Sequence, residues 1–177
     1  MTSEADRAAL VHVAREAIRA HVSHTSMPPI PQTGAAARRG AAFVTLHRAG
    51  ALRGCIGHLH TDAPLGQVVA ECAVAAASED PRFPPVSSDE APSLDVEISL
   101  LGPLEPVRSL DEIAIGKHGL VVESGWHRGL LLPQVATEWK WDAKTFVEQT
   151  CQKAGLPRDA WSSGAAKLFK FEAEVFS

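Results

Sequence analysis

The segment that most constrains how this chain can fold is LRGCIGH, residues 52–58, in which two glycines lie on either side of a cysteine. A glycine inside a strand has no side chain to pack, so it marks a place where another backbone or a ligand comes very close. Gly54 and Gly57 therefore predict a close approach at this segment. Cys55 lies between them, so whatever approaches the glycines also approaches its thiol.

Residues 43–58 have the pattern of a β-hairpin, because two apolar-rich runs are separated by a short segment that contains a glycine. If Ala49 and Gly50 form the turn, Val44 lies opposite Cys55. Both faces of the second strand would then be apolar. This arrangement favours a central strand with a buried, structural cysteine.

Helical spacing of apolar residues predicts three helices, each beginning near a residue that caps helices with its side-chain oxygen. The predicted helices begin near Ser3, near Asp62 or Thr61, and near Asp142. The apolar stripe of the second helix includes Cys72, which is therefore predicted to be packed and unreactive.

Alternating apolar and polar residues predict strands over residues 94–100 and 169–175, and residues 119–133 have the pattern of a second hairpin. Strands and helices are mixed without a regular βαβ rhythm. This order predicts an α+β fold with mainly antiparallel pairing. A length of 177 residues is sufficient for a single domain with a sizeable core.

The composition is that of a soluble globular protein. A net charge of −4 and a pI near 6.0 argue against nucleic-acid binding. No apolar run reaches membrane-spanning length, and residues 1–6 are acidic without the apolar core of a secretory signal, so we expect a cytoplasmic protein. The three cysteines are far apart and odd in number, which indicates reduced thiols.

Arg53, Cys55 and His58 are the candidate catalytic residues. On a regular strand Arg53 and Cys55 point to one face and His58 to the other. A guanidinium near a thiol lowers its pKa and favours the nucleophilic thiolate. A base is also needed, and His58 reaches Cys55 only if Gly57 bends the strand. A reactive cysteine and a structural cysteine in a tight packing site both remain open.

The segment DPRFPP, residues 80–85, ends the second helix and contains three prolines. Proline stiffens the chain, so this loop presents Arg82 and Phe83 in a fixed position. We expect the two side chains to form a wall of a ligand site and to converge on residues 52–58.

A metal site is not predicted. His58 and His60 share a strand face, yet no acidic or cysteine residue stands at convincing ligand spacing. Asp62 is better explained as a helix cap, and no cofactor is indicated.

Two further sets of residues admit a functional or a structural explanation. The first set consists of His118, Glu123 and His127, which would be either acid and base groups that face residues 52–58 or simply exposed polar residues of the second hairpin. The second set consists of Trp126, Trp139, Trp141 and Trp161, which would either stack on a flat substrate or pack against other parts of the protein.

The unbroken run of residues 52–57 resembles the signature of the AMMECR domain family. Further similar segments are residues 40–46, 80–86, 117–120, 129–136 and 142–161, so the resemblance runs from about Gly40 to the C-terminus, and residues 1–35 resemble the family least. The resemblance implies one compact domain, residues 1–177, with a large and a small lobe and with the cysteine segment lining the space between them. It also implies partners, because related domains occur fused or adjacent to Memo-like dioxygenase-fold proteins and radical SAM proteins (the AmmeMemoRadiSam association).

The leading hypothesis is that a cleft binds a small anionic or planar ligand, as part of an enzyme or of an accessory to a modifying enzyme. The residues expected to contact the ligand are Arg53, Gly54, Cys55, Gly57, His58, Arg82 and Phe83. One alternative is a non-catalytic protein-interaction module. RNA binding is another alternative, and the acidic charge disfavours it.

Overall fold

The structure, a computed structural model, describes residues 2–59 and 62–177, and it divides into two compact units. Unit 1 comprises Met1–Leu101 and Glu174–Ser177, and unit 2 comprises Gly102–Ala173. Helices and antiparallel strands occur in both units, which confirms the predicted α+β class. The single two-lobed domain stays a prediction.

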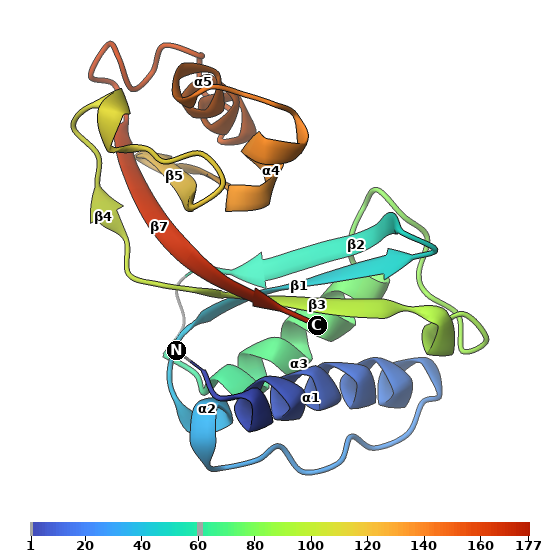
Figure 1. Cartoon of the computed structure of the whole chain (residues 1–177). Coiled ribbons are helices and arrows are strands. Elements are labelled where there is room, and N and C mark those ends of the chain that lie inside the picture. The colour runs from blue at the N-terminus through green and yellow to red at the C-terminus, as the bar shows by residue number, and fades with distance from the viewer. Residues whose placement is uncertain (1, 60–61) are drawn as a thin grey trace. The chain divides into compact units, whose positions relative to one another are not determined.

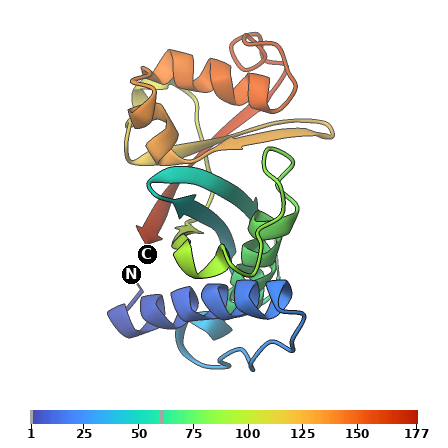
Figure 2. The same cartoon turned by 90° about the vertical axis from the view of Figure 1, so that its right-hand side faces the viewer.

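In the described residues, the elements of unit 1 are three helices, one 3-10 turn and three strands. They are α1 (Glu4–Val22), α2 (Gly34–Ala37), β1 (Ala41–Arg48), β2 (Ala51–His58), α3 (Leu65–Ser78), the 3-10 turn η1 (Ala91–Ser93) and β3 (Asp95–Leu101). Strand β1 pairs antiparallel with β2 on one side and with β3 on the other. Figure 1 and Figure 2 show α1 and α3 together on one face of this sheet.

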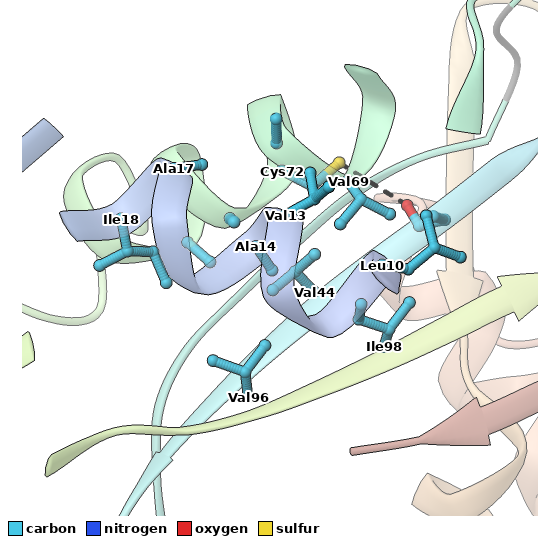
Figure 3. Close-up of a cluster of buried hydrophobic side chains, with 14 of the residues drawn as sticks. Leu10, Val13, Ala14, Ala17, Ile18, Val44, Val69, Cys72, Val96 and Ile98 are labelled. Atoms are coloured by element: carbon cyan, nitrogen blue, oxygen red, sulfur yellow. Dashed lines mark hydrogen bonds between the residues drawn. The ribbon is translucent and has the colours of Figure 1, made fainter. Parts of the chain in front are cut away.

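The core of unit 1 lies between that sheet face and the two helices (Figure 3). Val44 and Ile98 are fully buried in it, as is Leu10 of α1. Cys72 of α3 is also fully buried, and its Sγ lies 3.7 Å from the carbonyl oxygen of Ala42. The predicted packed position of Cys72 is confirmed.

Helix α1 begins and packs as its sequence predicts. The Ser3 hydroxyl accepts a hydrogen bond from the Asp6 N–H and caps the first turn. The predicted apolar stripe is buried; it consists of Leu10, Val13, Ala14, Ala17 and Ile18. The Asp6 carboxylate accepts hydrogen bonds from the Ser3 hydroxyl at 2.7 Å and from the Ala35 N–H at 2.8 Å, so one side chain links the start of α1 to α2.

Helix α3 has the predicted buried stripe, but its predicted cap is wrong. Pro64 occupies the N-cap position without a side-chain hydrogen bond, and the Leu65 N–H is instead satisfied by the Arg38 carbonyl at 2.7 Å. The Asp62 side chain is fully exposed, 3.9 Å from Arg39. Thr61, the alternative cap, lies outside the described residues.

The hairpin of β1 and β2 turns where predicted, but its register differs by one residue. Ala49 and Gly50 both have positive φ, 51° and 79°, as a tight hairpin turn requires. Val44 nevertheless pairs with Ile56, and Thr45 pairs with Cys55. The prediction that Val44 faces Cys55 is wrong because an irregularity between Leu46 and His47 displaces every pair farther from the turn by one residue.

Unit 2 contains the remaining elements. They are β4 (Glu105–Pro106), η2 (Leu110–Glu112), β5 (His118–Ser124), β6 (His127–Leu131), α4 (Pro133–Glu138), α5 (Ala143–Lys153) and β7 (Lys167–Phe176), whose last residues belong to unit 1. Strand β5 pairs antiparallel with β6 and with β7. The Asp142 carboxylate caps α5 by accepting from the Thr145 N–H at 2.8 Å, as predicted.

Two predictions in unit 2 need correction. The second hairpin ends before Pro133, which instead begins the unpredicted helix α4. The alternation in β7 holds for Phe171, which is 1% exposed, but fails for Val175, which is 44% exposed. In the part of the chain that the structure describes, no helix is long and apolar enough to cross a membrane.

Candidate functional site

The two glycines of β2 lie where other parts of unit 1 come very close. A Cβ on Gly54 would overlap the backbone carbonyl oxygen of Ala76 in α3, and a Cβ on Gly57 would overlap the ring of Phe43. The predicted close approach is confirmed. The groups that approach belong to the chain itself, so packing alone accounts for both glycines.

Asp80 joins the end of α3 to the free edge of β2. Its Oδ2 accepts a 2.9 Å hydrogen bond from the Cys55 N–H, which β1 does not use. Its side chain is only 2% exposed. The carboxylate also accepts hydrogen bonds from Arg82, at 2.7 Å from Nη2 and 3.0 Å from Nε. These bonds, those from Arg82 above all, hold the pKa of Asp80 well below its usual range.

Arg82 and Phe83 are brought to Cys55 through Asp80, as the stiff loop predicts. The Arg82 side chain is 52% exposed although its guanidinium is tied to Asp80. Its Cζ lies 5.5 Å from the centroid of the Phe83 ring. The result is a fixed cation that rests on an aromatic face and remains open to solvent.

Arg53 is not the charged partner of the Cys55 thiol that the sequence predicted. Its Nε and Nη2 donate to Glu90 at 2.7 and 3.1 Å, and its side chain is only 13% exposed. The hairpin irregularity explains this position, because Leu46 pairs with Gly54 and His47 pairs with Leu52, which leaves Arg53 without a partner on β1.

The two arginines therefore have different roles around one ring. The Cζ atom of Arg53, whose guanidinium is bound to Glu90, lies 5.9 Å from the centroid of the Phe83 ring. The hydrogen bond from Arg53 is the main reason why the pKa of Glu90 is lowered. Arg82, rather than Arg53, is the cation whose charge acts on Cys55.

Cys55 is partly exposed. Its Sγ lies 3.3 Å from the Thr45 hydroxyl, which donates to it. Burial nevertheless raises the pKa of the thiol, and the opposing effects of Thr45 and Arg82 do not reverse the shift. The thiol is therefore protonated at neutral pH, and the predicted lowering of its pKa by Arg53 is wrong.

His58 lies at the end of β2, exposed and paired with Ala42. Strand alternation places it on the face opposite Cys55, because no further irregularity separates the two residues. His60, its proposed metal partner, lies outside the described residues. Within residues 2–59 and 62–177, no group of three or more metal-binding side chains comes together.

Sequence reasoning missed the residues that complete this neighbourhood. Thr45 pairs with Cys55 on one side and with Glu97 of β3 on the other. All three side chains lie on the sheet face that points away from α1 and α3, since the alternating residues face the core. The polar alternation of β3 indicated an outer face for Glu97, but nothing in the sequence indicated its neighbours.

The candidate acid and base groups of unit 2 have structural partners. His118 is 9% exposed, its Nδ1 accepts from the Ala114 N–H at 3.0 Å, and burial lowers its pKa. Glu123 forms an ion pair with Arg128. The predicted exposure of His118 is therefore wrong, and a catalytic role for these groups stays a prediction.

The tryptophans of unit 2 differ strongly in exposure. Trp126, in the turn between β5 and β6, is fully exposed. Trp139 is 68% exposed and stacks on Trp141, with ring centroids 6.0 Å apart and 16° between the planes. Trp141 and Trp161 pack against the core of unit 2.

Comparison with known proteins shows similarity over almost the whole chain. The AMMECR1 family model matches residues 11–176. A protein of Methanothermobacter thermautotrophicus is 44% identical over 175 residues, which cover 94% of this chain and 91% of that protein. A protein of Methanosarcina acetivorans is 46% identical over 157 residues, 86% of this chain and 76% of its own.

A solved structure has the same fold. The crystal structure of the uncharacterized protein PH0010 from Pyrococcus horikoshii matches with a TM-score of 0.88 and 40% sequence identity. The match covers 94% of this chain and 88% of that one.

Proposed function

The chain belongs to the AMMECR1 family, and we propose that its unit 1 binds a small ligand whose anionic group is held by Arg82. The observation that carries this proposal is the Arg82 guanidinium, which is half exposed and yet fixed by a buried carboxylate. A long side chain held in place loses little conformational freedom on binding, which favours recognition.

The unused edge of Arg82 has the geometry that an anion needs. Asp80 occupies Nε and Nη2, which leaves both Nη1 hydrogens and one Nη2 hydrogen for a ligand. Carboxylates and phosphates bind such an edge through two parallel hydrogen bonds. Because Asp80 offsets part of the positive charge, we expect small probes to bind with dissociation constants of about 1 mM, or about 4 kcal/mol.

A planar ligand fits the same place. Phe83 offers an aromatic ring beside Arg82, and Arg53 also contacts that ring. Aromatic and guanidinium planes stack favourably on flat groups. An aromatic carboxylate such as benzoate therefore combines both expected features in one probe.

The test is an NMR titration of ¹⁵N-labelled protein with benzoate and with benzyl alcohol, its uncharged counterpart. Benzoate should shift the Arg82 Nε–H signal and the Cys55 amide, and Arg82→Gln should abolish the Cys55 shift. Arg108→Gln, which changes an exposed arginine of unit 2, serves as the matched control. Equal shifts from both compounds, or an unchanged response in Arg82→Gln, would refute the proposal.

Catalysis by Cys55, Arg53 and His58 stays a prediction. Arg53 is engaged by Glu90, His58 lies on the opposite face, and the pKa of the thiol is raised. These three observations favour binding over a thiolate mechanism. Ligand contacts at the glycines and a cleft between two lobes are likewise still predictions.

A protein-interaction function is the second candidate, and the exposed tryptophans of unit 2 favour it. Trp126 is fully exposed in a hairpin turn, and tryptophan is enriched among the residues that dominate binding at interfaces. The partner suggested by the family resemblance is a Memo-like or radical SAM protein. Trp126→Ala should abolish binding of such a partner in calorimetry and leave the benzoate titration unchanged; unchanged partner binding would reject this surface.

A further inference from the structure

The polar row, defined as Cys55, Thr45 and Glu97, crosses three adjacent strands of unit 1 on one sheet face. Thr45 of β1 pairs directly with Cys55 of β2 and with Glu97 of β3. Arg82 stands beyond the β2 end of the row, because Asp80 links it to the outer edge of that strand. The row therefore has a cation at one end and a carboxylate at the other.

The length of the polar row follows from the pairing geometry. The Cys55 N–H turns away from β1 to Asp80, so Cys55 and Thr45 form the closer, non-hydrogen-bonded kind of pair. Thr45 then forms the wider kind of pair with Glu97. Cα separations of about 4.5 and 5.5 Å place Cys55 and Glu97 about 10 Å apart.

Glu97 is a partly exposed carboxylate that the described residues leave without a partner. Among the described residues it makes no hydrogen bond and no ion pair, although neighbouring carboxylates such as Asp80 and Glu90 have several. An ionised carboxylate that no side chain of the protein engages is available to accept hydrogen bonds from a ligand.

A second polar atom on the same face also lacks a partner. Ser99 lies two residues along β3 from Glu97 and pairs with Phe43. It is fully buried, and its hydroxyl makes no hydrogen bond within the described part of the chain. The alternation of apolar and polar residues over 94–100 indicated a polar outer face, and the burial of Ser99 departs from that pattern.

We propose that the ligand is a zwitterion, whose anionic group binds Arg82 and whose ammonium group binds Glu97. This inference rests on the proposed anion site and adds the second end of the ligand. The partly exposed Cys55 lies between the two charges, and its thiol accepts a hydrogen bond from the buried Thr45. The Cα atoms of Cys55 and Glu97 are already about 10 Å apart and Arg82 stands beyond Cys55, so an α-amino acid is too short to reach both charged groups, and a chain with separated charges fits.

The experiment compares amino acids of increasing chain length with the matched acids that lack the amine. The probes run from glycine to 6-aminohexanoate, with acetate to hexanoate as partners, in the same NMR titration. We expect an intermediate or long amino acid to bind about tenfold more tightly than its matched acid, which corresponds to about 1.4 kcal/mol. Glycine should gain nothing over acetate.

Two variants make the test specific for Glu97. Glu97→Gln keeps the size of the side chain and should remove the advantage of the amine without weakening the plain acids. Glu97→Asp shortens the side chain by one methylene and should move the best ligand to a chain one methylene longer. A purely structural role of Glu97 would not change the preferred length.

The outcomes separate this inference from the proposed function. If plain acids bind in an Arg82-dependent way and the amine adds nothing, the zwitterion is refuted and the anion site stands. If neither benzoate nor any of these probes binds, both are refuted. If the amine helps equally in the wild type and in Glu97→Gln, its partner is another residue, and the assignment to Glu97 is overturned.

Discussion

Replacing Gly54 with alanine tests how closely β2 and α3 are packed. The added Cβ would lie closer than 3.0 Å to the carbonyl oxygen of Ala76, a separation that real Cβ atoms essentially never show. This oxygen belongs to helix backbone and cannot rotate away. Helix α3 would have to move away from the sheet as a rigid body, which would loosen the packing of its buried residue Ala73.

The expected loss follows from two opposing effects. Overpacking a core by one methyl group costs about 1–3 kcal/mol, and a rigid obstacle places Gly54→Ala at the upper end. Alanine also restricts the unfolded chain, which returns about 0.4–1 kcal/mol. The free energy of unfolding should therefore fall by about 2 kcal/mol.

Urea unfolding followed by circular dichroism measures this loss. Gly40→Ala is the matched control, because the atom nearest to its new Cβ is the flexible end of Leu65, at 3.2 Å. The control should change the free energy of unfolding by less than about 0.5 kcal/mol. If Gly54→Ala is as stable as the control, the strand and the helix are not in the contact described.

Three further predictions concern titratable groups. At pH 7, Cys55 should react with iodoacetamide faster than the fully buried Cys72 and Cys151. It should react more slowly than it does in unfolded protein, because burial raises the pKa of its thiol. Mass spectrometry after brief labelling measures the three rates, and equal rates for the native thiols would contradict the site. Asp80→Asn should lower the free energy of unfolding by about 1–2 kcal/mol. Because the pKa of Asp80 is lowered in the folded state, the difference in free energy of unfolding between wild type and variant should disappear as the pH falls below about 4. A difference in urea unfolding that is constant with pH would refute the ion pair. Burial lowers the pKa of His118, so protonation favours the unfolded chain and the protein should lose stability as the pH drops below about 6.5. Melting curves at pH 7.5 and 5.5 should show this loss of stability in the wild type and a smaller loss in His118→Gln.

The sequence by itself determined the features that depend on near neighbours. Ser3 and Asp142 cap their helices as predicted, because a cap involves a side chain and an N–H only three residues away. The turn at Ala49 and Gly50 was likewise predictable from local backbone preference. The two glycines of β2 correctly indicated a close approach, since the absence of a side chain is visible in the sequence.

Only the tertiary structure decided which groups meet. One irregularity in the hairpin left Arg53 unpaired and turned it to Glu90, and a shift of a single residue reverses which face every later side chain occupies. Asp80 could be read as part of a stiff loop, but its bond to the Cys55 N–H depends on where α3 ends against β2. The partners of Thr45, including Glu97, come from strands that are separate in sequence, so no local pattern encodes the row that they form.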